Sequence, residues 1–189
     1  MKNAYREWIA QVDRMAAELS ARYASHLVCR AGCSGCCGHH LSVFPVEGEA
    51  IREAVAALPA EVRARVRAQA RAVEEREARG QEAGCPMLIE DRCAIYDARP
   101  VICRTQGLPL LLGIEEGEAD VDFCPLNFTA PDAAEALEVE HLVPLEKLNL
   151  QLAVVNLAWC REQGIDPAAE PVRIRMSELA QEQRGEFSS

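Results

Sequence analysis

Aromatic side chains and long apolar runs are both in short supply in this sequence. Aromatic residues make up 5% of its 189 residues, so the core has to be packed mainly with Leu, Val, Ile and Ala. No stretch approaches the roughly 18 consecutive apolar residues that a membrane-spanning helix needs. The sequence therefore predicts a soluble protein without a membrane partner.

Basic residues are outnumbered as well. The chain has 20 Lys and Arg residues against 30 Asp and Glu residues, which gives a formal net charge of −10. A body this acidic repels phosphate backbones, so we expect no nucleic-acid partner. Hydrophobic residues nevertheless reach 49%, which is ordinary for a globular protein and too high for a disordered one.

The opening residues lack the apolar run of a secretory signal, because charged and apolar residues alternate as far as Ser25. We therefore expect a cytoplasmic protein, in a compartment that keeps thiols reduced. Nine cysteines in such a compartment need a role other than disulfide bonds, and metal binding is the usual one. The odd number of cysteines also favours metal binding, because disulfide bonds alone would leave one thiol unpaired.

Helical periodicity dominates the chain outside its middle. Trp8, Val12, Met15 and Leu19 form one apolar stripe, which predicts an amphipathic helix. Comparable patterns and their flanking Pro and Gly residues predict four more helices, at about residues 46–58, 60–79, 144–163 and from 177.

The middle of the chain, residues 85–128, contains four prolines and no long helical stripe. Asp97–Arg104 is expected to form a short helical turn, and Leu110–Ile114 and Val121–Phe123 are expected to pair as a small hairpin. The predicted fold class is mainly α, a helical scaffold around an irregular cysteine-rich core with one small β-hairpin.

The order of the predicted helices and the cysteine-rich middle also predicts the domain organisation. We expect one metal-binding helical domain at 1–165, with its cysteine-rich core at 29–128. A C-terminal tail at 166–189 would carry the last short helix.

The first group of cysteines is dense. Cys29, Cys33, Cys36 and Cys37 fall within nine residues, and Cys33-x2-Cys36 has the spacing of a metal knuckle, whose two intervening residues let both sulfurs face one ion. Glycines at 32, 35 and 38 would let the backbone approach a metal closely. A helical segment would also place the four sulfurs on one face, so either geometry makes them converge.

The second group, Cys85, Cys93, Cys103 and Cys124, is dispersed and lacks the second Cys-x2-Cys pair of a zinc ribbon or RING domain. The eight thiols together could form one site with spare ligands or two four-cysteine sites. Cys160 falls on the last long predicted helix and is interpreted as a small buried hydrophobe.

Cations and imidazoles accompany the cysteines. A guanidinium beside a metal-bound thiolate would stabilise it, although Arg is common throughout this chain and Lys nearly absent. The arginines in question are Arg30, Arg92, Arg99 and Arg104. His39 and His40 follow the first group, and either could be a zinc or iron ligand or an ordinary loop histidine. His26 and His141 are interpreted as structural.

The cysteines recur in short motifs with characteristic neighbours. These are Cys29-x3-Cys33-x2-Cys36-Cys37, Cys85-Pro86-Met87-Leu88 and Cys93-Ala-Ile95-Tyr96-x2-Arg99-Pro100-x2-Cys103-Arg104, with further pieces at 107–110, 124–128 and 148–156. Together they resemble the YkgJ-type cysteine cluster family, described as a zinc- or iron-chelating domain, over about residues 29–160.

The resemblance implies a ligand set and a supporting shell. The core ligands would be Cys33, Cys36, Cys37, Cys85, Cys93 and Cys103, with Cys29 and Cys124 as additions. The shell that orients them by packing and hydrogen bonds would be Tyr96, Arg99, Pro100 and Arg104. Three residues separate Cys29 from Cys33, where the shorter family pattern has two.

Both zinc and iron–sulfur chemistry suit thiolate ligands. A Zn²⁺ ion would be tetrahedral, redox-silent and structural. Iron–sulfur clusters accept more varied ligand spacings, so the lack of two matched knuckles slightly favours an iron–sulfur cluster over Zn²⁺ and leaves both open.

Two classes of function remain. The preferred one is a metal-binding module without catalysis, acting as a carrier, a sensor or a structural element. The alternative is an iron–sulfur enzyme using S-adenosylmethionine, because Cys29-x3-Cys33-x2-Cys36 has the spacing of radical enzymes, and flagellin lysine-N-methylases carry a similar cluster. Those radical enzymes are βα-repeat barrels, and this sequence shows no strand–helix alternation. It also has no nucleotide-binding glycine loop, His-Glu-x2-His helix or serine elbow.

A cysteine hydrolase pairing a thiol with His39, His40 or His141 would leave eight cysteines unexplained. The metal hypothesis has one structural requirement, that sulfurs from distant parts of the chain meet in the folded protein.

Overall fold

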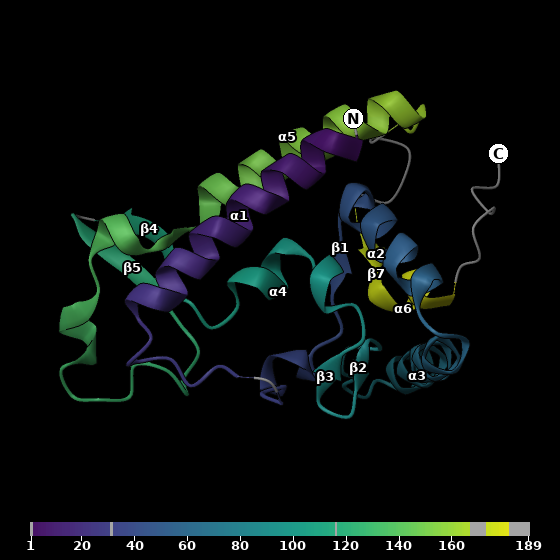
Figure 1. The fold of residues 1–189 in the computed structure, drawn as a ribbon, viewed down its shortest axis with the longest axis horizontal. Coiled ribbons are helices and arrows are strands. Elements are labelled where there is room, and N and C mark those ends of the chain that lie inside the picture. Colours follow the sequence, from purple (N-terminus) through teal and green to yellow (C-terminus); the bar gives the residue numbers. More distant parts are fainter. Residues whose placement is uncertain (1, 31, 116, 167–172, 182–189) are drawn as a thin grey trace. The chain divides into compact units, whose positions relative to one another are not determined.

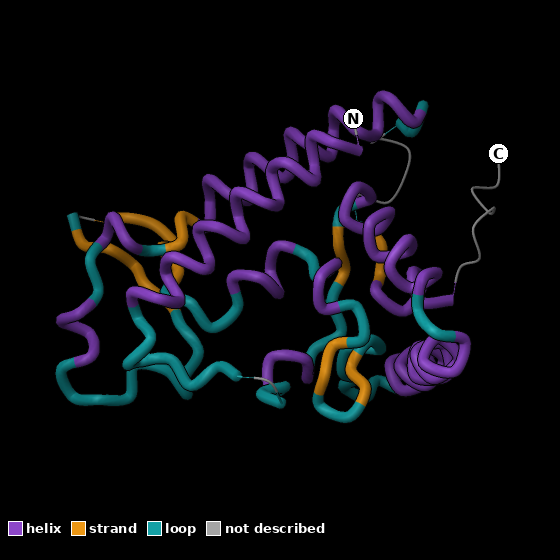
Figure 2. The backbone as a smooth tube through the Cα atoms, in the orientation of Figure 1, coloured by secondary structure: helices purple, strands orange, loops and turns teal. Residues whose placement is uncertain are grey.

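A computed structural model describes residues 2–30, 32–115, 117–166 and 173–181. It is mainly α, as the sequence predicts: 56% of the structure is helical, and the described part has six α-helices beside sheets of two or three strands (Figure 1; Figure 2). None of the helices in these ranges combines the length and apolar character that crossing a membrane requires.

The chain divides into two compact units, each made of segments far apart in the sequence. Unit 1 consists of residues 1–30 and 101–159, and unit 2 of residues 31–100 and 160–189. The division into a domain at 1–165 and a tail at 166–189 stays a prediction.

Unit 1 is built on α1 (Lys2–Arg22) and most of α5 (Leu145–Gln163), which run side by side in opposite directions (Figure 1). The predicted stripe of α1 is confirmed, because Val12 and Leu19 are buried. Trp8 Nε1 donates a hydrogen bond to Gln151 Oε1 across the two helices at 3.2 Å. Apolar burial therefore decides which faces of the two helices meet.

The predicted hairpin is also present in unit 1. Strands β4 (Leu110–Glu115) and β5 (Glu118–Asp122) pair antiparallel, and the short strand β6 (Val143–Pro144) adds to β4 in parallel. Helix α4 (Val101–Thr105) precedes the hairpin. Two 3₁₀ turns, η3 (Ala133–Ala136) and η4 (Val139–His141), lead into β6.

Unit 2 packs α2 (Pro45–Ala57), α3 (Ala60–Ala78) and α6 (Met176–Gln181) around one apolar core. Strand β1 (Ser42–Val43) pairs with β7 (Ile174–Arg175), which leads directly into α6. Gly48 of α2 permits close packing, since a Cβ there would lie 3.1 Å from Leu179 Cδ2. The core consists of Val43, Ile51, Val55, Val66, Ala70, Met87, Ile95, Met176, Leu179 and Ala180.

The remaining elements of unit 2 carry cysteines. They are the 3₁₀ turn η1 (Gly35–Gly38), the hairpin of β2 (Leu88–Ile89) with β3 (Arg92–Cys93), and the 3₁₀ turn η2 (Tyr96–Ala98). Strands of two residues are too short to show alternation of apolar and polar side chains, so the sequence did not predict them.

Candidate metal centre

Unit 2 brings four of the predicted ligands into one neighbourhood: Cys36, Cys37, Cys85 and Cys93. Cys36 and Cys37 lie in η1, and the backbone N–H of Cys85 donates a hydrogen bond to the Cys37 carbonyl oxygen at 2.8 Å. Gly84 is needed at this crossing, because a Cβ there would lie 3.1 Å from that oxygen. The two segments therefore run against each other.

The β2–β3 hairpin brings Cys93 beside the segment that carries Cys85. Cys93 pairs with Leu88, and the N–H of Ala94 donates to the Met87 carbonyl at 2.8 Å. The turn of this hairpin is tied to the first cysteine loop, since Ser34 Oγ donates to Asp91 Oδ1 at 2.7 Å.

Burial and mutual repulsion shape the charge state of these thiols. Burial, followed by the negative charges that Cys36 and Cys85 would carry, raises the pKa of Cys37 to about 12. Burial likewise raises the pKa of Cys85 to about 11, with Cys93 and Cys36 adding to the rise. The pKa of Cys93 is raised mainly by burial and further by Cys36. The sulfurs of Cys37, Cys85 and Cys93 therefore lie close enough to Cys36 for its negative charge to oppose their ionisation.

Two backbone N–H groups act in the opposite direction. Met87 donates to the sulfur of Cys85, and Ile95 donates to the sulfur of Cys93, which lowers the pKa of each thiol. Both donors stand two residues after their cysteine, so the two cysteines occupy equivalent local turns. Such N–H···S bonds stabilise a thiolate and aim its sulfur.

Arg99 adds a positive charge to this neighbourhood and lowers the pKa of Cys93. Its guanidinium stacks 3.6 Å from the centroid of the Tyr96 ring, and its Nε donates to the Tyr96 carbonyl at 3.0 Å. Arg104, in contrast, belongs to unit 1 and pairs with Asp13 at 2.5 Å. The supporting role that the resemblance implies for Arg99 and Arg104 stays a prediction.

The donor set of unit 2 fits a soft cation. Cys37, Cys85 and Cys93, whose pKa values are raised, stay protonated by themselves, whereas a bound cation reverses that balance and favours the thiolates. Cys36 is exposed and the other three are partly buried, so one side of the group faces solvent. Zn²⁺ and iron–sulfur clusters are both compatible with such ligands.

The other predicted ligands divide between the units. Cys33 lies in unit 2 and is exposed, while Cys29, Cys103 and Cys124 belong to unit 1. Cys160, on α5, is 1% exposed, which agrees with its interpretation as a buried hydrophobe.

Asn127 organises the cysteine segments of unit 1 and was not predicted. Its Nδ2 donates to Cys29 Sγ at 3.5 Å and to the Gly107 carbonyl at 2.7 Å, while its Oδ1 accepts from the Val28 N–H at 2.9 Å. Its own N–H donates to the Cys124 carbonyl at 2.8 Å. The side chain is 1% exposed and joins three distant segments, a role that no local sequence pattern reveals.

The family is decided by a match over residues 28–125, a span that contains all eight predicted ligands and excludes Cys160. The matching model is described as "CxxCxxCC: Putative zinc- or iron-chelating domain". This chain belongs to the CxxCxxCC family. No curated protein and no solved structure gives a match. The resemblance seen in the sequence is confirmed, and the family assignment supports binding of zinc or iron.

The two histidines of this CxxCxxCC protein that follow the first cysteine group, His39 and His40, differ in exposure and in hydrogen bonding. Both ring nitrogens of His40 are engaged, Nδ1 with Glu77 Oε1 at 2.8 Å and Nε2 with the Ser177 N–H at 3.1 Å. Nε2 therefore accepts and Nδ1 carries the proton. Burial lowers the pKa of His40, and Arg175 adds to that effect. These bonds favour a structural role for His40, whereas His39 is exposed.

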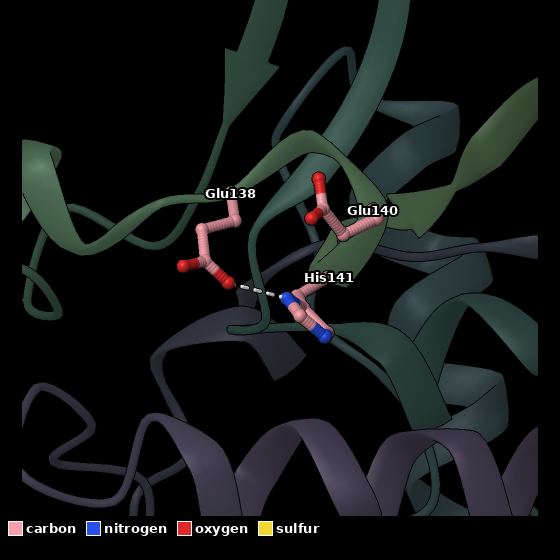
Figure 3. A group of neighbouring side chains, drawn as sticks. All are labelled: Glu138, Glu140 and His141. Carbon is pink, nitrogen blue, oxygen red and sulfur yellow. Dashed lines mark hydrogen bonds and ion pairs between the residues drawn. The ribbon is translucent and has the colours of Figure 1, made fainter.

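A second group of potential ligand atoms lies in unit 1, outside the matched span. Within the described ranges, Glu138, Glu140 and His141 are the group whose ligand atoms all lie within 4.8 Å of one another (Figure 3). His141 Nδ1 and Glu138 Oε2 are 2.7 Å apart, and Arg22 Nη2 lies 2.8 Å from His141 Nε2. Because a guanidinium already occupies the open side of the imidazole, we assign no cation to this group.

Among the described residues, no three cysteine sulfurs all lie within 4.8 Å of one another. Ligands around tetrahedral Zn²⁺ lie about 3.8 Å from one another, as Zn–S bonds of about 2.3 Å require. Closing the four sulfurs of unit 2 around an ion therefore requires rotation of their side chains.

Proposed function

We propose that this CxxCxxCC-family protein is a metal-binding module without catalysis of its own, and that Cys36, Cys37, Cys85 and Cys93 hold the metal as thiolates. The observation that carries the proposal is their convergence in unit 2, where the Cys85 N–H bonds to the Cys37 carbonyl and the β2–β3 hairpin brings Cys93 beside the Cys85 segment. Burial and the neighbouring thiols raise the pKa values of Cys37, Cys85 and Cys93. Thiols crowded in this way are costly to ionise unless a cation binds among them.

An iron–sulfur cluster is the metal group that we favour, with a carrier or sensor role. Structural zinc sites are closed by their ligands. Here Cys36 is exposed, so a bound cluster would have one edge open to solvent or to a partner. A cluster with an exposed edge is suited to being transferred to a partner or to sensing. The ligand spacing slightly favours an iron–sulfur cluster over zinc as well.

The first test is elemental analysis with a visible spectrum on protein purified without oxygen. A brown protein with stoichiometric iron and sulfide would support the cluster, whereas a colourless protein with stoichiometric zinc would replace it with a structural zinc site. Protein that binds neither metal after reconstitution would refute the proposal.

The ligand assignment is tested by cysteine replacement. Cys85→Ser should lower metal content and thermal stability together, because ligand binding and folding are coupled in thiolate sites. Cys160→Ser is the matched control, since this buried cysteine lies outside the family span and should leave the metal content unchanged. Equal metal content in both variants would exclude Cys85 as a ligand.

Cys29, Cys33, Cys103 and Cys124 are proposed as further ligands or as ligands of a second site. The number of thiols that metal protects from alkylation distinguishes these cases. Four protected cysteines would limit the site to the unit 2 group, and a larger number would identify which of the other four take part.

Catalysis with S-adenosylmethionine receives less support. It would require Cys29, Cys33 and Cys36 to ligate one cluster, and Cys29 Sγ already accepts a hydrogen bond from Asn127. Cleavage of S-adenosylmethionine by the reduced, loaded protein would nevertheless restore the enzyme interpretation.

A further inference from the structure

The β2–β3 hairpin reverses direction through two residues with an unusual backbone. Ile89 pairs with Arg92, so Glu90 and Asp91 form the turn between the strands. Their φ angles are 51° and 58°, in the left-handed region that a two-residue hairpin loop of type I′ requires at both positions. Asn followed by Gly is the usual pair in such a loop, because these residues adopt positive φ readily. Glu followed by Asp therefore leaves the turn strained.

Both side chains of this strained turn contact other segments of unit 2. Glu90 Oε1 accepts a hydrogen bond from Arg65 Nη2 of α3 at 2.8 Å, and Asp91 Oδ1 accepts one from Ser34 Oγ at 2.7 Å. A glycine at either position would relieve the backbone and lose the contact. A residue choice that opposes the local preference in this way indicates that the contacts themselves have a role.

Ser34 lies inside the knuckle, as one of the two residues between Cys33 and Cys36. Its carbonyl oxygen accepts from the Cys37 N–H at 2.8 Å, so the residue that contacts the hairpin also closes the turn η1. All four residues of η1 are exposed or only partly buried. Apolar packing therefore contributes little to the position of this turn, and hydrogen bonds have to fix it.

The knuckle is fastened to both of the other ligand segments. The Cys37 carbonyl accepts from the Cys85 N–H at 2.8 Å. At the other end of the knuckle, the Ser34 hydroxyl donates to Asp91, which stands two residues before Cys93. These contacts fix the backbones of the three segments relative to one another, so that closing around a metal is left to the side chains.

We propose that Ser34 and Asp91 are positioning residues of the metal centre. The strained turn holds the Asp91 carboxylate against the knuckle, and this contact places Cys36 and Cys37 relative to Cys93. Ligands that a supporting hydrogen bond already holds in place bind a metal more tightly, because less ordering accompanies binding. The inference rests on the proposed function and deepens it, since it names residues that control affinity without touching the metal.

Asp91→Gly distinguishes positioning from a purely structural role. The glycine removes the carboxylate and relieves the backbone, so the metal-free protein should melt at or above the wild-type temperature. Zn²⁺ affinity, measured by competition with a chelator, should nevertheless fall about tenfold, as loss of a supporting contact to a metal site does. A lower melting temperature with unchanged Zn²⁺ affinity would overturn the proposal.

Glu90→Gly is the matched control, because it relieves the same turn and removes a carboxylate that contacts α3 instead of the knuckle. Its Zn²⁺ affinity should stay at the wild-type value, and a loss equal to that of Asp91→Gly would overturn the proposal.

Substitution of Ser34 tests the contact from the other side. Ser34→Ala should reproduce the tenfold loss of affinity, and Ser34→Thr, which keeps the hydroxyl, should retain the wild-type value. The double variant Ser34→Ala/Asp91→Gly should lose no more affinity than either single variant, because both remove the same hydrogen bond. Additive losses would show that the two residues act separately, and would overturn the proposal.

A measurement without metal separates this inference from the proposed function. Amide exchange at Cys37, whose N–H is bonded to the Ser34 carbonyl, should be faster in metal-free Ser34→Ala and Asp91→Gly than in Glu90→Gly. If the wild type binds metal while all three variants exchange and bind alike, the positioning role alone is overturned. If the wild type binds neither Zn²⁺ nor iron, the proposed function is refuted and this inference with it.

Discussion

At the scale of single residues, Gly107 and Cys29 are fitted to each other. Gly107 has a φ of 95°, and a Cβ at this position would lie 2.7 Å from Cys29 Sγ. Glycine therefore meets two requirements here, a backbone conformation that other residues rarely adopt and room for a sulfur. Asn127 completes the fit by donating to both Cys29 Sγ and the Gly107 carbonyl.

Gly107→Ala should destabilise the protein by about 1–3 kcal/mol, since the new methyl group meets the sulfur and the backbone is strained at positive φ. It should also make Cys29 more reactive by displacing it from Asn127. Thermal unfolding and the alkylation rate of Cys29, followed by mass spectrometry, measure the two effects.

Gly113→Ala provides the control, because a Cβ at Gly113 has no other atom within 4 Å. Identical melting and alkylation in the two variants would show that the close approach of Cys29 to Gly107 has no energetic weight.

At the scale of elements, His40 fastens α6 to the rest of unit 2. Its Nε2 accepts from the Ser177 N–H in the first turn of α6, and its Nδ1 contacts Glu77 on α3. Arg175, just before α6, also pairs with Glu77. A short helix with few hydrogen bonds of its own depends on such tertiary contacts.

Acid should release α6. The pKa of His40 is lowered below 6.5 by burial and by Arg175, so folding favours the neutral ring. A group with a depressed folded-state pKa gives full stability above its unfolded value and loses it as pH falls. Protonation would also place a hydrogen on Nε2 and break its bond with Ser177. Amide hydrogen exchange in residues 176–181, corrected for intrinsic rates, should therefore accelerate at pH 5.5 relative to pH 7.5.

His40→Ala should remove most of this pH dependence, and His39→Ala, at an exposed neighbouring position, should keep it. Acid acceleration of equal size in both variants would assign the effect to another titrating group.

At the scale of the whole molecule, the thiol group couples metal binding to pH. The pKa values of Cys37 and Cys85 are raised to about 12 and about 11, from 9.0, mainly by burial. These thiols are protonated near neutrality, so a metal has to displace their protons. Metal affinity should therefore rise steeply with pH, and binding should release protons, as competition titrations between pH 6 and 8 can measure.

Without metal, the stability of the protein should fall as pH rises, whereas metal affinity should increase. A raised folded-state pKa gives stability that is complete below the unfolded value and declines as pH rises through the folded value. Metal-free protein should therefore lose stability above about pH 9, and Cys37→Ser should reduce that loss. Denaturant titrations at pH 7.5 and pH 10, under reductant, would detect this loss. A pH-independent free energy of unfolding would mean that folding does not raise the pKa values of these thiols.

Much of the local structure was predictable from the sequence because its causes are local. Apolar stripes and flanking Pro and Gly residues predicted α1, α2, α3, α5 and α6. The segments 110–114 and 121–123, on either side of 115–118, predicted the β4–β5 hairpin. The cysteine motifs predicted the family. The cytoplasmic location, the absence of a nucleic-acid partner and the ligand identities stay predictions.

The sequence by itself determined the eight motif cysteines, the helical scaffold and membership of a family described as a zinc- or iron-chelating domain. Only the tertiary structure decided which thiols are neighbours, grouping Cys36 and Cys37 with Cys85 and Cys93 in one unit and joining Cys29 to Asn127 in the other. The reason is physical: these contacts join segments tens of residues apart, and packing of the whole chain, rather than local spacing, brings them together.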